Sequence, residues 1–144
     1  MKGNNTMKKN GFIIIYCILI IFFIFSKFSI ANITVDDYCQ LTILMIQQDI
    51  SNYQKLISIV QQYKNNPKEL NYQNNILKNN IDKNRKILFS SFNIKSRTYY
   101  LYMGENSNLV NSYLNTHYNI KVKIKDLANQ RDKILNRYES LIKN

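Results

Sequence analysis

The chain has 144 residues and a formal net charge of +11, from 20 lysines and arginines against nine aspartates and glutamates. This length suits one small domain and excludes two. Lysine, asparagine, isoleucine and tyrosine are abundant and alanine is scarce, which we attribute to AT-rich coding sequence, so lysine or asparagine richness alone assigns no function.

The first 31 residues have the order of an export signal. Three lysines precede an apolar run at 12–25, and the small residues Ser29 and Ala31 follow it. This order predicts a signal peptide, residues 1–31, cleaved after Ala31. The alternative is an uncleaved N-terminal anchor in which residues 12–31 enter the membrane, although the apolar run is shorter than the roughly 20 residues of a typical span. Both interpretations place the rest of the chain outside the cytoplasm.

Residues 32–144 are predicted to form the folded domain. Without the first 31 residues, four lysines are lost and the net charge falls from +11 to +7. One cysteine, Cys39, is left, so no internal disulfide can form and the fold must depend on an apolar core. A domain of this size can bury enough surface for that.

The stretch 34–64 predicts a long amphipathic helix at the centre of the domain. Thr34 and Asp37 have the spacing of a capping box, and Pro67 excludes helical continuation. Apolar residues recur in steps of four and three, which places them on one helix face and is also typical of coiled coils. These residues are Cys39, Ile43, Ile46, Ile50, Tyr53, Ile57 and Val60.

A second helix is predicted from Pro67 to about Ser91. Asn66 suits the N-cap, proline suits the first turn and Glu69 suits the third helical position. Because the connection to the first helix is short, the two should form an antiparallel hairpin. The apolar stripe of this second helix is thinner, with Leu70, Leu77, Ile81, Leu88 and Phe92.

Two further helical segments complete the predicted fold. The third follows Ser96 and runs to His117, and we expect it to be a helix that tolerates Gly104. The fourth begins near Asn119 and has the same steps of four and three as the first. The alternation of apolar and basic residues at 120–125 is a strand pattern, but no partner strand is available. The sequence therefore predicts an all-α antiparallel bundle of about four helices in two hairpins.

The sequence offers no constellation for catalysis, so we expect no enzyme. The nine acidic residues are scattered, and the domain has one histidine and one cysteine far apart. These counts provide neither a zinc set nor a di-iron helix pair. A single glycine in the domain excludes a glycine-rich phosphate loop. We therefore predict no catalytic residue, no metal and no cofactor.

One aromatic cluster is a candidate interaction face, because tyrosine and methionine are enriched at interfaces. It consists of Tyr99, Tyr100, Tyr102 and Met103. The alternative, which we favour, is that three of these residues fill the core while Tyr100 is half exposed.

Three single residues require an interpretation. Cys39 lies on the core stripe and is expected to be buried, with an intermolecular disulfide or a reactive thiol as the alternative. His117 is expected at a helix end or in the core rather than as a ligand. Arg131 replaces an apolar residue in the fourth stripe, so it should reach the bundle edge or pair with Asp49 or Asn106; a solvated position is the alternative.

These observations predict an exported helical protein that acts as a non-catalytic binding or structural module of the cell envelope. Its partner is an unknown envelope protein or polymer. The alternative function is a periplasmic-type chaperone that holds unfolded clients on a basic, tyrosine-rich face. Export and the lack of a recognition motif argue against nucleic acid. Membrane contact is expected only through residues 12–31, if they are not removed. The expected location is the periplasm, the cell surface or the extracellular space.

Overall fold

The computed structural model describes residues 32–143, so the signal peptide or anchor predicted for residues 1–31 lies outside the described residues. Within 32–143 the protein contains five helices and no strand, which confirms the all-α class and makes the expected number of about four too low. The helices are α2 (Val35–Tyr63), α3 (Pro67–Ser91), α4 (Ser96–Glu105), α5 (Ser107–Thr116) and α6 (Tyr118–Lys143).

The predicted capping box begins α2. The backbone N–H of Thr34 donates to a carboxylate oxygen of Asp37 at 2.7 Å, and the N–H of Asp37 donates to the Thr34 hydroxyl at 3.2 Å. These bonds satisfy two of the N–H groups that a helix start leaves without partners. The bond from the Thr34 N–H lowers the pKa of the Asp37 carboxyl, and the Thr34 hydroxyl, which donates to the same oxygen at 2.8 Å, lowers it further.

The helix α3 begins and ends as its local sequence dictates. The Asn66 side chain accepts the N–H of Glu69 at 3.2 Å, as predicted. At the other end, Asn93 has φ 52°, in the left-handed region that asparagine tolerates better than most residues. The N–H groups of Asn93 and Ile94 donate to the carbonyls of Ser90 and Phe89 at 3.0 and 3.1 Å. This is a Schellman ending, and it turns the chain toward α4.

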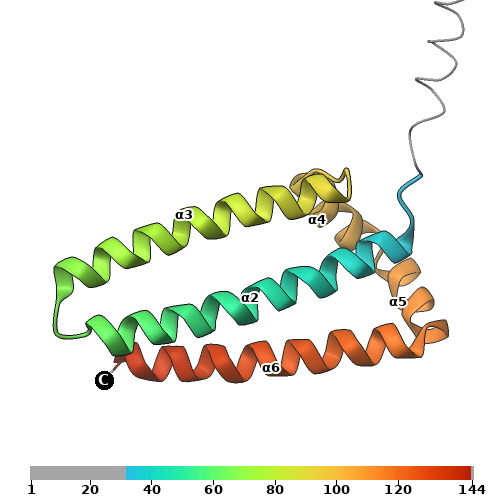
Figure 1. The fold of residues 1–144 in the computed structure, drawn as a ribbon. Coiled ribbons are helices and arrows are strands. Elements are labelled where there is room, and N and C mark those ends of the chain that lie inside the picture. Colours follow the sequence, from blue (N-terminus) through green and yellow to red (C-terminus); the bar gives the residue numbers. More distant parts are fainter. Residues whose placement is uncertain (1–31, 144) are drawn as a thin grey trace, which may run out of the picture. The chain divides into compact units, whose positions relative to one another are not determined.

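The three long helices lie side by side in one layer, with α2 between α3 and α6 (Figure 1). The α2–α3 hairpin and the central place of α2 are confirmed. The second predicted hairpin is wrong, because α6 runs parallel to α2 (Figure 1). Tyr53 and Tyr138, each about twenty residues after the start of its helix, have ring centroids 6.4 Å apart.

The parallel course of α6 follows from a break in the third predicted segment. The helix tolerates Gly104, but it stops at Asn106 and a second short helix begins. The Asn106 side chain donates to the carbonyl of Tyr102 at 3.2 Å, a local bond that competes with helix continuation. Helices α4 and α5, of ten residues each, span about 15 Å apiece. The two short helices therefore lead the chain across the end of the layer. One unbroken helix would instead have run back along the length of the layer.

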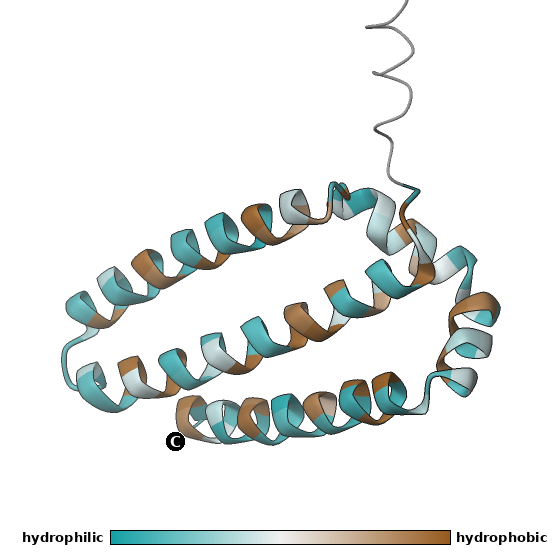
Figure 2. Ribbon diagram, turned by 45° about the vertical axis from the view of Figure 1, so that its right-hand side comes forward, coloured by the Kyte–Doolittle hydropathy of each residue, from teal (hydrophilic) through white to brown (hydrophobic). Residues whose placement is uncertain are grey.

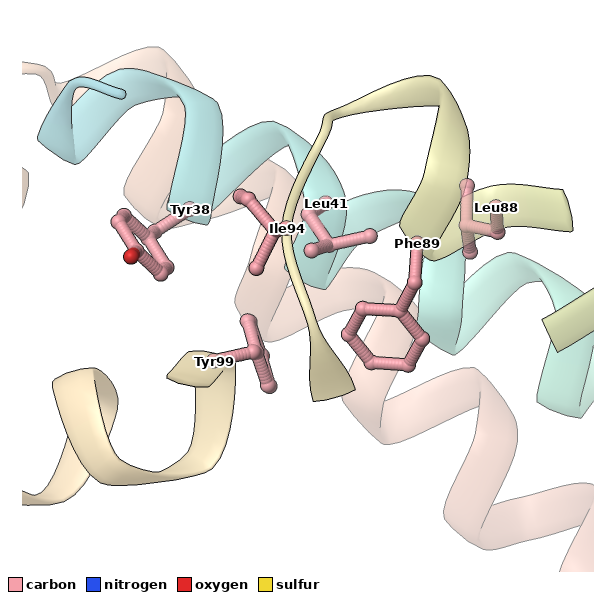
Figure 3. Packing of buried hydrophobic residues seen from close by; sticks show 6 residues of the cluster. All are labelled: Tyr38, Leu41, Leu88, Phe89, Ile94 and Tyr99. Atoms are coloured by element: carbon pink, nitrogen blue, oxygen red, sulfur yellow. The ribbon is translucent and has the colours of Figure 1, made fainter. Parts of the chain in front are cut away.

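A cluster of buried hydrophobic side chains lies at this α4–α5 end of the layer. Figure 3 shows how α2, α3, the connection after α3 and α4 each contribute side chains to it. The cluster consists of Tyr38, Leu41, Leu88, Phe89, Ile94 and Tyr99. The ring of Tyr102 stacks on Tyr38 with centroids 3.8 Å apart. This packing holds α4 against the long helices α2 and α3.

The layer leaves much apolar surface uncovered. Brown and teal segments alternate along all three long helices in Figure 2, as expected for amphipathic helices. The helix α6 contains no buried residue within the described part of the chain, although its apolar stripe is as regular as that of α2. Residues 120–125 are helical, as preferred over the strand pattern. Because α6 packs on one long helix only, its stripe stays half exposed.

Candidate functional site

The four residues of the predicted aromatic face do not form one exposed surface. Tyr99 is 6% exposed and belongs to the core cluster, and Tyr102 and Met103 are half-buried against that cluster. Tyr100 is 61% exposed. The structure therefore directs three of the four side chains toward the core, and only Tyr100 is presented to solvent. A role of these residues in binding stays a prediction.

A hydrogen bond fixes Tyr99 against the central helix. The Thr42 hydroxyl donates to the carbonyl of Tyr38 at 2.8 Å and lies 2.7 Å from the Tyr99 hydroxyl. Because Thr42 has one hydroxyl proton, Tyr99 is the donor in the second bond. Burial raises the pKa of Tyr99, and the bond to Thr42 opposes this shift. The arrangement is structural and keeps the phenol protonated at neutral pH.

Cys39 and His117 occupy places that fit their structural interpretations. Cys39 is 0% exposed, and burial raises the pKa of its thiol, with nearby Asp36 as a second cause. A buried, protonated thiol is a poor nucleophile. His117 ends α5, where its ring stacks on Tyr113 with centroids 3.8 Å apart. The Tyr113 hydroxyl in turn donates to Asp36 at 2.7 Å, which ties α5 to the start of α2.

An ion pair joins α2 to α3, and it differs from the one predicted. Arg85 donates to Asp49 at 2.6 Å, with side chains 25% and 29% exposed respectively. Arg131 instead donates to its neighbour Asp132 at 2.8 and 2.9 Å, so its predicted pairing with Asp49 or Asn106 is wrong. Arg131 lies on an outer, half-open helix, where water can solvate its guanidinium group. Because its guanidinium group is accessible to water, Arg131 does not need an ion-pair partner from another helix.

Two open grooves lie along α3. The larger, of about 530 Å³, runs between α2 and α3, and its wall combines amide and hydroxyl groups, as in Ser58 and Asn80, with the apolar residues Ile59, Ile76 and Leu77. The smaller, of about 480 Å³, lies where α3 meets α4, with Arg85, Lys86 and Lys95 in its wall. Sequence patterns did not indicate either groove, because all the lining residues except Leu77 fall outside the predicted apolar stripes.

The helix α6 combines half-buried apolar side chains with a basic surface. Half-buried apolar residues recur along the whole helix, from Ile120 to Leu141. The same helix carries seven basic and three acidic side chains, a net charge of +4. The sequence indicated the apolar stripe of α6, but only the structure showed that α2 is the one long helix that packs against it.

The described residues provide no arrangement for metal or for a membrane span. Within 32–143, histidine, cysteine, aspartate and glutamate side chains do not come together in groups of three that would hold a metal ion. Every helix in this range is too short or too polar to cross a lipid bilayer.

Comparison of the chain with protein-family models, with curated proteins and with solved structures finds no match.

Proposed function

We propose that the protein is an exported, non-catalytic binding module of the cell envelope, and that α6 binds an amphipathic helix of a partner protein. The observation that carries the proposal is the half-covered stripe of α6, which has no buried residue despite its regular apolar spacing. A helix laid along such a stripe would bury apolar side chains at positions four and three residues apart. About 25 cal/mol is gained for each Å² of apolar surface removed from water.

The charge of α6 suggests which kind of helix would bind. With seven basic and three acidic side chains, α6 has a net charge of +4. Complementary charges at the rim of an interface speed association and exclude like-charged competitors. The partner helix is therefore expected to be acidic on its flanks and apolar on the face that meets α6.

The export part of the proposal is supported by residues 1–31 and can be tested separately. A reporter that is active only outside the cytoplasm, fused after Asn32, should be active. N-terminal sequencing of the product then distinguishes cleavage after Ala31 from an uncleaved anchor that retains Met1. A reporter that stays inactive would contradict export.

Site-specific photo-crosslinking in the native host tests the binding surface. A photoreactive amino acid at Leu135, a half-buried apolar residue of α6 next to Ile134 of the stripe, should give one discrete adduct in the envelope fraction. The matched control is Asn136, the next residue, which is exposed on the outer side of the same helix. Reversing two exposed charges, with Lys133→Glu and Arg137→Glu, should reduce the Leu135 adduct several-fold. Equal adducts at both positions, or none at Leu135, would refute the proposal.

The chaperone function is the rival outcome of the same experiment. A holding chaperone would give many adducts of different sizes and would suppress aggregation of an unfolded model protein in a salt-sensitive way. Its predicted tyrosine-rich face finds limited support, because the most exposed tyrosines, Tyr72, Tyr100 and Tyr118, belong to three different helices.

A further inference from the structure

Exposed apolar side chains gather at the α4–α5 end of the layer. Among the described residues, ten large apolar side chains are exposed. Five of them lie in α4, in α5, at the start of α6 or just before the start of α2, and these segments are all at this end (Figure 1). These five, called the end patch below, are Ile33, Tyr100, Leu101, Leu109 and Tyr118, with exposed fractions between 37% and 71%. The buried cluster of Tyr38, Leu41, Leu88, Phe89, Ile94 and Tyr99 lies at the same end.

The chain enters the domain at the same end. Ile33 of the end patch follows residues 26–32, seven residues that separate it from the apolar run at 12–25. Even fully extended, seven residues span at most about 25 Å. The 29 residues of α2 rise about 43 Å from this end to the other. When the apolar run is in a bilayer, Ile33 therefore lies within about 25 Å of the end of that run along the chain.

We infer that the full chain docks the end patch, Ile33, Tyr100, Leu101, Leu109 and Tyr118, onto the interfacial region of a lipid bilayer. Tyrosine suits this region because its ring lies among apolar groups while its hydroxyl reaches water. Leucine and isoleucine would bury their aliphatic groups just below the headgroups. This inference does not depend on the partner helix proposed for α6.

The charge near the end patch favours a general lipid surface over a purely anionic one. Lys95 and Arg97 lie at the start of α4, and Glu105 lies at its end. Lys121 and Lys123 lie in the first two turns of α6. Asp37 is occupied in its own helix cap, and Asp36 accepts the Tyr113 hydroxyl. Because these charges are mixed, docking should already occur on zwitterionic vesicles and should not require anionic lipid.

Tryptophan fluorescence in the full chain tests the inference, because the natural sequence has no tryptophan. Tyr100→Trp places one reporter in the end patch. Tyr72→Trp is the matched control, since Tyr72 is 60% exposed and Tyr100 is 61% exposed. Tyr72 lies near the start of α3, about 28 Å along the helix from its α4 end.

Both variants are placed in phosphatidylcholine vesicles whose acyl chains carry bromine near the headgroup. We expect blue-shifted emission from Trp at position 100, with quenching at least twice that at position 72. Equal quenching at the two positions, or emission at position 100 like that in water, would overturn the inference.

A second pair of variants tests whether the apolar side chains themselves cause docking. In the Tyr100→Trp background, Leu101→Glu should lower the quenching at least twofold. Ile142→Glu, at the opposite end of the layer and of similar exposure, should leave it unchanged. Circular dichroism confirms that both variants stay helical. If Leu101→Glu folds and quenching persists, the end patch does not bind lipid.

Discussion

The ion pair between Asp49 and Arg85 provides the sharpest test of how α2 and α3 are joined. We expect Asp49→Ala to destabilise the domain, because Arg85 then loses the carboxylate that it meets at 2.6 Å. One guanidinium nitrogen of Arg85, Nη1, is already buried without a partner. Removal of the carboxylate therefore leaves a partly buried cation with almost no compensation.

The size of the effect follows from the burial of the pair. A hydrogen bond to a charged group contributes about 1.5–3 kcal/mol, and an exposed ion pair about 0–1 kcal/mol. With a quarter of the Arg85 side chain and 29% of Asp49 exposed, solvent screens part of the interaction. We expect a loss of about 1–2 kcal/mol in the free energy of unfolding. For a domain of this size that lowers Tm by about 4–8 °C.

Urea titration and thermal melts of the parent and two variants measure this loss. Asp82→Ala is the matched control, because Asp82 is exposed within α3 and has no ion pair within the described residues. Both substitutions remove one negative charge and gain the same helix propensity, so their difference isolates the ion pair. Should Asp49→Ala and Asp82→Ala melt at the same temperature, the assignment of Arg85 as a stabilising partner is refuted.

Three further predictions concern the helix ends and the buried thiol. Asn93→Val should lower the free energy of unfolding by about 1 kcal/mol, because a β-branched residue is strained at φ 52°. Asn93→Gly should be neutral or stabilising. The midpoints of urea unfolding measure both effects, and equal midpoints for the two variants would contradict the Schellman ending. The hydrogen bond to Asp36 raises the pKa of Tyr113 from 10.0 to about 12, so its stabilisation is present below pH 10 and lost as pH rises toward 12. Between pH 10 and 12 the Tyr113→Phe variant should therefore lose less unfolding free energy than the parent. If both proteins show the same dependence of unfolding free energy on pH, the hydrogen bond between Tyr113 and Asp36 does not contribute to stability. Cys39 should react with a thiol reagent only as fast as the domain opens, in a Cys17→Ser variant that removes the other cysteine of the chain. Reaction at the rate of a free thiol would show that Cys39 is not buried.

Local interactions made much of the fold predictable from the sequence. The start of α2 depends on the capping box of Thr34 and Asp37. The start of α3 depends on Asn66 and Pro67. In each case the residues that interact are within four positions of one another. The apolar steps of four and three identified the face of α2 that packs against its neighbours. Such features act over one or two helical turns, so the order of residues contains them.

The direction of α6 and the location of open surface were decided only by tertiary structure. Two short helices in place of one long helix make α6 parallel to α2, and the difference arises at Asn106, where a local side-chain bond competes with the helix. Tertiary structure also decided that Asp49 pairs with Arg85 of α3, while Arg131 pairs with its neighbour Asp132. An apolar stripe predicts that a helix packs, but how many helices cover it depends on contacts between residues far apart in the chain. The half-covered stripe of α6 and the end patch could therefore be recognised only once the helices were placed together.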